Sequence, residues 1–249
     1  DWAVCDPNEP KSRRSRCGLL LQKWGGQAGE PGQAATVLID TPPEVRQQLA
    51  AARCARLDAV MISHDHADQT NGFDDIRAFF LRQRAQLPVM MDDNTAHTFM
   101  RRFGYAFESG PGYPAIAHRT EHLAPLAPVR IDGPGGALEI TPLDQDHGFS
   151  RSLGFRVGPL GYSNDLVGMP DASFAALSNL DLWIVDALRD RPHPTHASVE
   201  QALGWIARLT PKRSVLTNMH IDLDYAALRA RLPAGVEPAY DGWTVDLVI

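Results

Sequence analysis

Short apolar runs that end in histidine or aspartate recur along this chain, and they constrain its fold more than any other feature. They end at Ser63-His64, Asp146-His147, Asn164-Asp165, Val185-Asp186 and Asn218-Met219-His220. Apolar runs of this length are typical of buried strands. Many α/β folds place functional groups on loops at strand ends, where a rigid sheet positions them. The pattern therefore predicts a sheet-based fold with its chemistry at strand ends.

Helical stretches alternate with these runs, which favours an α/β protein. We expect strands within 18–22, 36–40, 57–63, 87–92, 137–148, 153–165, 180–188 and 213–220, and a closing hairpin at 237–247. We expect helices within 44–54, 74–85, 94–105, 173–180, 196–209 and 224–232. The Gly-rich segment 24–35 indicates a hairpin loop. Because hairpins imply antiparallel pairing, two mixed sheets covered by helices fit better than a doubly wound parallel sheet.

Composition excludes several classes of function. A formal charge of −6 argues against a general nucleic-acid coat or a binder of anionic membranes. No apolar run reaches the roughly 18 residues of a membrane span. Cys5, Cys17 and Cys54 have no CxxC spacing, which favours a reducing compartment, the cytoplasm, over a disulfide framework or a cysteine zinc site. No signal peptide is recognisable, and what precedes Asp1 is left open.

The stretch MISHDHADQTNG (61–72) is the strongest candidate for a metal site. In an extended segment residues two apart face the same side, so His64 and His66 can bind one ion. Imidazole and carboxylate ligands suit zinc, and also manganese or iron. The competing interpretation is a polar loop after a strand, and the later strand ends with His147 and Asp165 weigh against it.

Several motifs in order resemble one known family. The stretch SHDHADQTNGFDD resembles the HxHxDH signature of the metallo-β-lactamase superfamily, and LIDT (38–41) resembles the strand end before it. The resemblance extends through TPLDQDHG, YSND, VLTNMHIDLDY and YDGWTV, and so covers nearly the whole chain. The chain looks most like the PhnP-type phosphodiesterases, which hydrolyse cyclic and other small phosphodiesters. The resemblance implies one hydrolase domain over 1–249, a four-layer αββα sandwich of two mixed β-sheets flanked by helices, with the family's first strand missing.

The resemblance also implies a metal centre. By position, His64, His66 and His147 match the three histidines of the first metal site. Asp165 matches a carboxylate that bridges two ions, and Asp68 matches the aspartate of the second site.

Three further residues are implied beside the metal. His196, in PTHAS, corresponds to a histidine next to the substrate phosphate in the PhnP-type subgroup. Asp40 would orient a ligand histidine through its ring N–H, and Asp186 would play a similar supporting part.

The chain departs from the family pattern at the second metal site. That site uses a histidine after Asp68, where this chain has Gln69, and another where this chain has Asn218. His220 could compensate if its loop is rearranged, although the alignment does not place it there. An amide oxygen is a weak neutral ligand, better suited to a hard cation than to zinc. We therefore expect one firmly held divalent ion, zinc or manganese, and a second ion that is weak or absent.

The resulting hypothesis is metal-assisted hydrolysis of a small, cyclic or nucleotide-like phosphodiester. An ion at the first position would lower the pKa of bound water towards about 7 and supply hydroxide, which attacks phosphorus in line with the leaving oxygen. His196 would bind the phosphate or protonate the leaving group. Asp68 would bind a second ion or, with only one ion present, orient the water as a base.

Two other functions stay open. The same fold hydrolyses thioesters and lactones, so a metal-dependent hydrolase of those substrates is the first alternative. A non-catalytic nucleotide- or phosphate-binding protein is the second, and the retained histidines and aspartates argue against it. The basic run KSRRSR (11–16) could bring positive charge to a phosphate, although a solvated loop is favoured. We expect a small phosphodiester or nucleotide-like substrate and neither a nucleic-acid polymer nor a membrane, and a homodimer is one assembly that the sequence allows.

Overall fold

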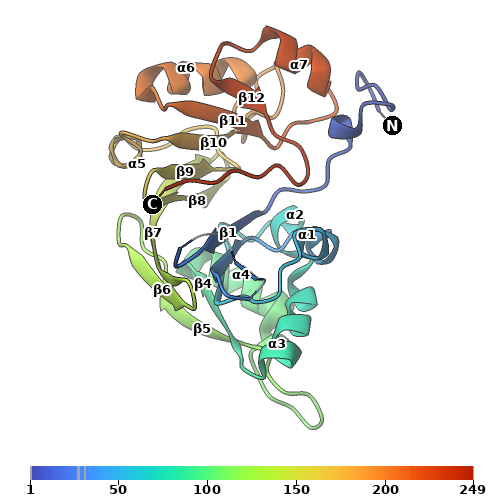
Figure 1. The fold of residues 1–249 in the computed structure, drawn as a ribbon, viewed down its shortest axis with the longest axis vertical. Coiled ribbons are helices and arrows are strands. Elements are labelled where there is room, and N and C mark those ends of the chain that lie inside the picture. The colour runs from blue at the N-terminus through green and yellow to red at the C-terminus, as the bar shows by residue number, and fades with distance from the viewer. Residues whose placement is uncertain (1, 27–28, 31, 249) are drawn as a thin grey trace. The chain divides into compact units, whose positions relative to one another are not determined.

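Strands from the apolar runs form a five-stranded and a seven-stranded sheet, both of mixed pairing and flanked by helices (Figure 1). The computed structural model describes residues 2–26, 29–30 and 32–248. The chain divides into an N-terminal unit, Arg16–Ile140, and a C-terminal unit, which combines the chain up to Ser15 with Thr141–Ile249. The expected fold class of two mixed sheets with flanking helices is confirmed.

The N-terminal unit contains the five-stranded sheet in the order β1-β2-β3-β4-β5. Its strands are β1 (Leu19–Lys23), β2 (Ala35–Ile39), β3 (Ala59–Met61), β4 (Leu87–Met91) and β5 (Ala117–His122). Strands β1 and β2 pair antiparallel, as the expected hairpin requires, although Gln27, Ala28 and Pro31 of its loop lie outside the described residues. The other pairs are parallel. Strands β2 to β4 are therefore almost entirely buried, as parallel strands covered by helices are.

Helices of the N-terminal unit pack around an aromatic cluster. They are α1 (Val45–Ala51), α2 (Ala67–Thr70), α3 (Arg77–Gln83) and α4 (Asp93–Phe103), with 3-10 turns η2 (Phe73–Ile76) and η3 (Gly104–Ala106). Phe73 and Phe99 are fully buried with ring centroids 4.8 Å apart. Asp92 begins α4 by accepting a hydrogen bond from the Thr95 amide at 2.7 Å.

The C-terminal unit contains the strands from the second half of β7 to β12. They are β7 (Gly136–His147), β8 (Ser150–Val157), β9 (Leu160–Ser163), β10 (Leu182–Asp186), β11 (Arg213–Thr217) and β12 (Val236–Pro238), and β6 (Val129–Gly133) pairs with the first residues of β7. Strands β7, β8 and β9 are antiparallel, and β9, β10, β11 and β12 are parallel. The carboxyl ends of β9, β10 and β11 therefore lie at one edge of the sheet.

Helices of this unit are α5 (Asp171–Ala176), α6 (Val199–Leu209) and α7 (Tyr225–Arg231), and a short turn η1 (Pro10–Ser12) lies near the N-terminus. Figure 1 shows α6 and α7 along β10, β11 and β12. Ser198 and Gln201 form a capping box that begins α6, and this fixes the backbone just after His196. Trp183 of β10 is buried beneath these helices and donates from its indole nitrogen to Ser163 Oγ at 3.1 Å.

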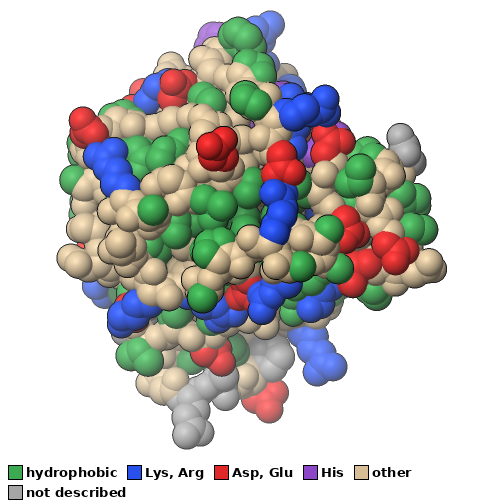
Figure 2. Space-filling model, turned by 90° about the horizontal axis from the view of Figure 1, so that it is seen from above, with side chains coloured by type: hydrophobic (Ala, Val, Ile, Leu, Met, Phe, Trp, Pro, Cys, Tyr) green, Lys and Arg blue, Asp and Glu red, His purple; other side chains and the backbone are tan. Residues whose placement is uncertain are grey.

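Charges of both signs are mixed on the face seen in Figure 2, where lysine and arginine lie among aspartate and glutamate with apolar side chains between them. Exposed ion pairs of the C-terminal unit include Lys212 with Asp181 at 2.7 Å and Arg231 with Asp190 at 2.6 Å. Among the described residues, no helix combines the length and apolar character that crossing a membrane requires.

Two predictions of secondary structure are wrong. Segment 153–165 is a hairpin of β8 and β9 rather than one strand, because Gly158 has a φ of +53° and Pro159 follows it. The closing hairpin at 237–247 does not form, and only Val236–Pro238 pairs there. Tyr240 and Trp243, which lie in this segment, instead contact the cations of Lys11 and Arg213.

Candidate metal centre

The loop after β3 presents the two histidines of the N-terminal unit. His64 is 1% exposed, whereas His66 is exposed and directly precedes α2. Their rings lie edge to face with centroids 4.6 Å apart. Gly72 ends this loop close to Pro42, because a Cβ there would lie 2.1 Å from the Pro42 carbonyl oxygen.

A chain of hydrogen bonds fixes the ring of His64. Ser63 Oγ donates to Asp40 Oδ2 at 2.8 Å, so its oxygen accepts from His64 Nδ1, 3.1 Å away. Nδ1 then carries the proton and Nε2 carries the lone pair that a metal ion needs. Asp40 thus acts on His64 through Ser63, a residue that the sequence did not single out. Burial raises the pKa of the Asp40 carboxyl from 3.8 to about 7.

Asp68 and Gln69 follow in the short helix α2. Gln69 is fully buried, and its Nε2 lies 3.4 Å from Asp68 Oδ2, to which it donates. Its carbonyl oxygen accepts from the Thr41 amide at 2.8 Å, so its backbone also ties this loop to the end of β2. The side-chain amide therefore turns its N–H towards Asp68.

In the C-terminal unit, His147 ends β7 and is 1% exposed. Its Nδ1 lies 2.8 Å from the Thr195 carbonyl oxygen, to which it donates. This bond leaves the lone pair on Nε2, as in metal-binding histidines. Because the acceptor is a backbone atom, the tautomer does not depend on the side chain at position 195.

Asp165 and His196 complete a cluster with His147. Their candidate ligand atoms all lie within 4.8 Å of one another. Asp165, which follows β9, is 1% exposed and has a φ of +54°. Asn164 Nδ2 donates to Asp165 Oδ2 at 2.6 Å. The sequence placed His196 beside the substrate, and the structure brings it next to these two candidate ligands.

His196 is paired with a second buried carboxylate. Its Nδ1 donates to Asp186 Oδ2 at 2.9 Å, and Asp186, the last residue of β10, is fully buried. Burial raises the pKa of Asp186, while the bond from His196 acts in the opposite direction. His196 is 16% exposed, so its ring can be reached from solvent. The supporting part predicted for Asp186 fits this contact.

Two other residues lie beside His196. Asn218, directly after β11, has a φ of +59°, and its Nδ2 donates to Asp165 Oδ1 at 3.3 Å. His193 was not predicted, yet its ring centroid lies 5.1 Å from that of His196. The spacing HPTH is the signal that could have indicated it. The side chain of His220 is 45% exposed, and its Nδ1 lies 3.4 Å from Asp222 Oδ2. This exposure does not fit a buried metal ligand.

These donors fit a divalent metal ion. The cluster combines two imidazoles, each with its Nδ1 donating to an acceptor, and a buried carboxylate, which are ligands that zinc and related ions take. The chemistry of the donors does not select among these ions.

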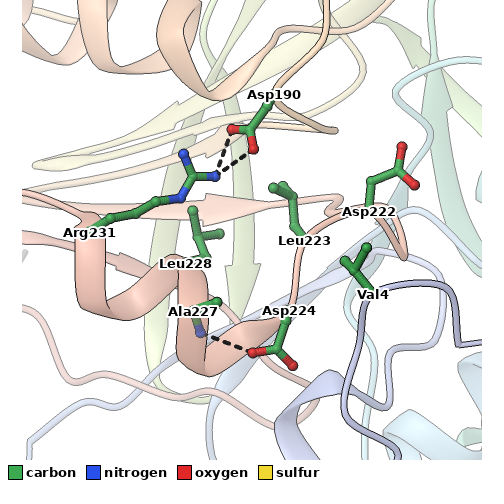
Figure 3. A pocket seen from close by; sticks show the side chains of 8 residues that line it. All are labelled: Val4, Asp190, Asp222, Leu223, Asp224, Ala227, Leu228 and Arg231. Carbon is green, nitrogen blue, oxygen red and sulfur yellow. Dashed lines mark hydrogen bonds and ion pairs between the residues drawn. The ribbon is translucent and has the colours of Figure 1, made fainter.

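A separate cavity of about 200 Å³ lies in the C-terminal unit, beside α7 (Figure 3). Asp190 there forms two hydrogen bonds with Arg231, at 2.6 and 2.8 Å, and Asp224 accepts from the Ala227 amide at 2.9 Å. Its carboxylates thus have partners already, and its lining includes none of the candidate metal ligands.

Comparisons with known proteins agree with this chemistry. Residues 35–221 match the family described as the beta-lactamase superfamily domain. An octanoyltransferase of Porphyromonas gingivalis (strain ATCC BAA-308 / W83) is 30% identical over 244 residues, which are 96% of this chain and 46% of that protein. The chain thus spans about half the length of the curated relative it matches.

Solved structures are similar over most of the chain. A diphosphatase from the PhnP family has a TM-score of 0.81 and 29% identity, covering 96% of this chain and 89% of that one. The metallo-β-lactamase fold protein YhfI from Bacillus subtilis has a TM-score of 0.72 and 19% identity, covering 97% and 95%. Since the family match covers well over half of the sequence, the chain belongs to the beta-lactamase superfamily and has the metallo-β-lactamase fold.

Proposed function

We propose that the protein is a metal-dependent hydrolase of small phosphodiesters, including cyclic and nucleotide-like ones. The observation that carries the proposal is the cluster of His147, Asp165 and His196, in which both rings are oriented through Nδ1. Similarity to a PhnP-family diphosphatase supports phosphoryl chemistry over other reactions of this superfamily.

The proposed ligands of the first ion are His64, His66, His147 and Asp165, as the superfamily signature implies. The hydrogen bond on Nδ1 of His64 and of His147 supports this assignment, because each leaves Nε2 as the ligand atom. The ion is zinc or manganese. When bound, it would supply a nucleophile from water and polarise the phosphoryl oxygens.

We propose that a second ion is weak or absent. The amides of Gln69 and Asn218 each present an N–H to a carboxylate, Asp68 and Asp165 respectively, that would otherwise serve that ion. An N–H donor repels a cation, so these contacts support a site with one firmly held ion. Asp68, without a second ion, is available to orient the attacking water.

His196 binds the substrate phosphate or protonates the leaving oxygen in this proposal. The buried Asp186 carboxylate accepts from Nδ1 and so leaves Nε2 available for the substrate. An imidazole can donate a hydrogen bond or a proton, which suits either task.

Elemental analysis and a substrate panel test this function. We expect about one equivalent of zinc or manganese in the purified protein, and turnover of bis(p-nitrophenyl) phosphate or of a diphosphate diester well above that of free metal. A thioester and nitrocefin serve as comparison substrates. Phosphodiester turnover no faster than that of the metal alone would exclude the proposal.

The alternative is a thioester or lactone hydrolase with the same residues. The relative named an octanoyltransferase favours acyl chemistry, although this chain spans only part of that protein. Faster turnover of octanoyl thioesters than of phosphodiesters would favour this alternative. Nucleotide binding without hydrolysis at any metal loading would instead indicate a non-catalytic binding protein.

We also propose a cytoplasmic location, because Cys5, Cys17 and Cys54 are free thiols. Subcellular fractionation tests this location, and we expect the protein in the cytoplasmic fraction. The homodimer stays a prediction, and light scattering of the purified protein tests it.

A further inference from the structure

In the C-terminal unit, Asn218 lies beside the buried carboxylate of Asp165 and beside His196, which pairs with the buried Asp186. Its Nδ2 donates to Asp165 Oδ1 at 3.3 Å and lies 3.5 Å from His196 Nδ1. His196 Nδ1 in turn donates to Asp186 at 2.9 Å. The side-chain amide of Asn218 therefore approaches both Asp165 and His196.

The orientation of the Asn218 amide follows from its neighbours. A reversed amide would place Asn218 Oδ1 against Asp165 Oδ1, and two acceptors at this distance repel each other. The NH2 group therefore faces Asp165. Since His196 Nδ1 carries its proton towards Asp186, the 3.5 Å approach of the two nitrogens is a packing contact, not a hydrogen bond.

His196 has two carboxylates within reach, and its single Nδ1 proton can bond only one of them well. Asp186 Oδ2 lies at 2.9 Å and Asp165 Oδ1 at 3.7 Å. Both carboxylates are almost fully buried, where an unbalanced charge attracts a nearby N–H strongly. A small rotation of the ring would exchange one partner for the other and would redirect Nε2.

We propose that Asn218 is a positioning residue that keeps His196 paired with Asp186. By donating to Asp165 Oδ1, the amide occupies the oxygen that would otherwise accept from His196. Asn164 holds the other oxygen, Oδ2, at 2.6 Å, so both oxygens of Asp165 already have amide donors. The consequence for catalysis rests on the proposed function of His196, whereas the pairing itself does not.

The variant Asn218→Gly tests the pairing. Glycine accepts the φ of +59° without strain, so the substitution removes the amide and preserves the backbone. We expect the Nδ1–H resonance of His196 in 1H–15N spectra of the purified protein to shift from its wild-type position. Loss of the resonance in His196→Gln assigns it, and Asp186→Asn gives the position expected when the Asp186 bond is lost.

Asn164→Ala is the matched control, because it removes a donor to the same carboxylate at Oδ2, whereas His196 approaches Oδ1. The resonance should stay at its wild-type position in that variant. An equal shift in both variants would overturn the proposal, as would an unchanged resonance in Asn218→Gly. If Asn218→Gly does not fold, the isosteric Asn218→Asp replaces it, and a wild-type resonance there also overturns the proposal.

Kinetics give a second readout in active protein. With a phosphodiester that has a poor alkoxide leaving group, Asn218→Gly should lower kcat about tenfold and leave KM nearly unchanged, in the range found for residues that orient catalytic groups. With a p-nitrophenyl phosphodiester, whose p-nitrophenolate leaving group needs no proton, the loss of kcat should be smaller. Equal losses for both leaving groups contradict a role through protonation of the leaving group by His196. If no phosphodiester is hydrolysed at all, the proposed function fails. The Nδ1–H resonance of His196 still shows whether Asn218 keeps His196 paired with Asp186.

Discussion

The two best-placed ligand histidines are oriented in different ways, and the difference has consequences for single substitutions. His64 depends on a side chain, Ser63, whereas His147 depends on the backbone carbonyl of Thr195. A substitution can remove the first acceptor but not the second. Of the two, only the tautomer of His64 is open to control by a neighbouring side chain.

Ser63→Ala should weaken metal binding about tenfold, because partners that orient metal-binding histidines typically contribute 10- to 100-fold to affinity. Competition with a chromophoric chelator measures this. Ser214→Ala, at another buried serine in β11, is the control and should leave the affinity unchanged. Equal affinities for Ser63→Ala and the wild type would mean that the Asp40–Ser63–His64 chain does not orient the ligand.

Asp40 should make the metal-free protein less stable as the pH rises. Its pKa is about 7 in the folded state against 3.8 ordinarily, so between these values the folded state binds a proton that the unfolded state has lost. The stability is thus fully present below about pH 4 and is lost as the pH passes through about 7. Urea unfolding in chelator should show a loss on the order of 2 kcal/mol between pH 5 and pH 8 from this group. Asp40→Asn should remove most of that loss, and an unchanged pH dependence would contradict the assignment.

At the scale of elements, the hairpin between β7 and β8 holds the loop that carries His196. Gly148 has a φ of +71°, and a Cβ on it would lie 2.6 Å from the Pro194 carbonyl oxygen. Gly148→Ala should therefore destabilise the protein by about 3 kcal/mol, from backbone strain and steric overlap together, and should reduce metal affinity by moving Thr195.

Gly242→Ala is the matched control for the hairpin. Its φ of +81° is similar, but no atom lies within 4 Å of an added Cβ. Gly242→Ala should lower the free energy of unfolding only by the backbone strain, about 1 kcal/mol, and should not change metal affinity. Thermal unfolding and chelator competition distinguish the two variants, and equal effects would show that strain alone accounts for Gly148.

Arg14, in the basic run near the N-terminus, binds a loop of the C-terminal unit, to which it belongs. Arg14 donates to the carbonyl oxygens of Met219, His220 and Leu223, at 3.3, 3.1 and 2.6 Å. The two sequence-based interpretations of this run were a phosphate contact and a solvated loop. In the structure, the guanidinium of Arg14 binds backbone carbonyls instead. Arg14→Ala should lower the free energy of unfolding by about 1–3 kcal/mol, because three backbone carbonyls, two of them part-buried, lose their charged donor.

Arg14→Lys should rescue little of this loss, since one ammonium group cannot reproduce the planar fork of the guanidinium. Arg13→Ala, next to it and exposed, should change stability by less than about 0.5 kcal/mol. Urea midpoints measure all three variants. A full rescue by lysine would mean that charge, rather than geometry, holds the loop.

At the scale of the whole molecule, metal should stabilise the folded chain. An ion that binds only the folded state at 100 times its Kd adds about 2.7 kcal/mol. Zinc or manganese should therefore raise the Tm of the wild type, and His147→Ala and Asp165→Ala should abolish the shift. His97→Ala, at an exposed position on α4, should retain it. An equal shift in all three variants would place the stabilising ion elsewhere.

Strand ends were predictable from the sequence because apolar runs and their polar boundaries are local. The structure ends β7 at His147 and β10 at Asp186, as predicted. Strands β3 and β9 end earlier, at Met61 and Ser163, so His64 and Asp165 lie in the loops just after them. The partners of these side chains were not predictable, because Thr195 reaches His147 across 48 residues of sequence. The false hairpin at 237–247 has the same origin, since its aromatic residues serve contacts with distant cations.

Left-handed backbone occurs at Asp40, Asp165 and Asn218, each just beyond a strand, with φ of 64°, 54° and 59°. Apart from glycine, aspartate and asparagine accept this conformation most readily. Substitutions that keep both the backbone and a polar side chain are therefore nearly confined to exchanges between these two residues, which differ by one formal charge and almost nothing in shape. During evolution, the net charge around the centre could thus change in single steps while the main chain stays in place.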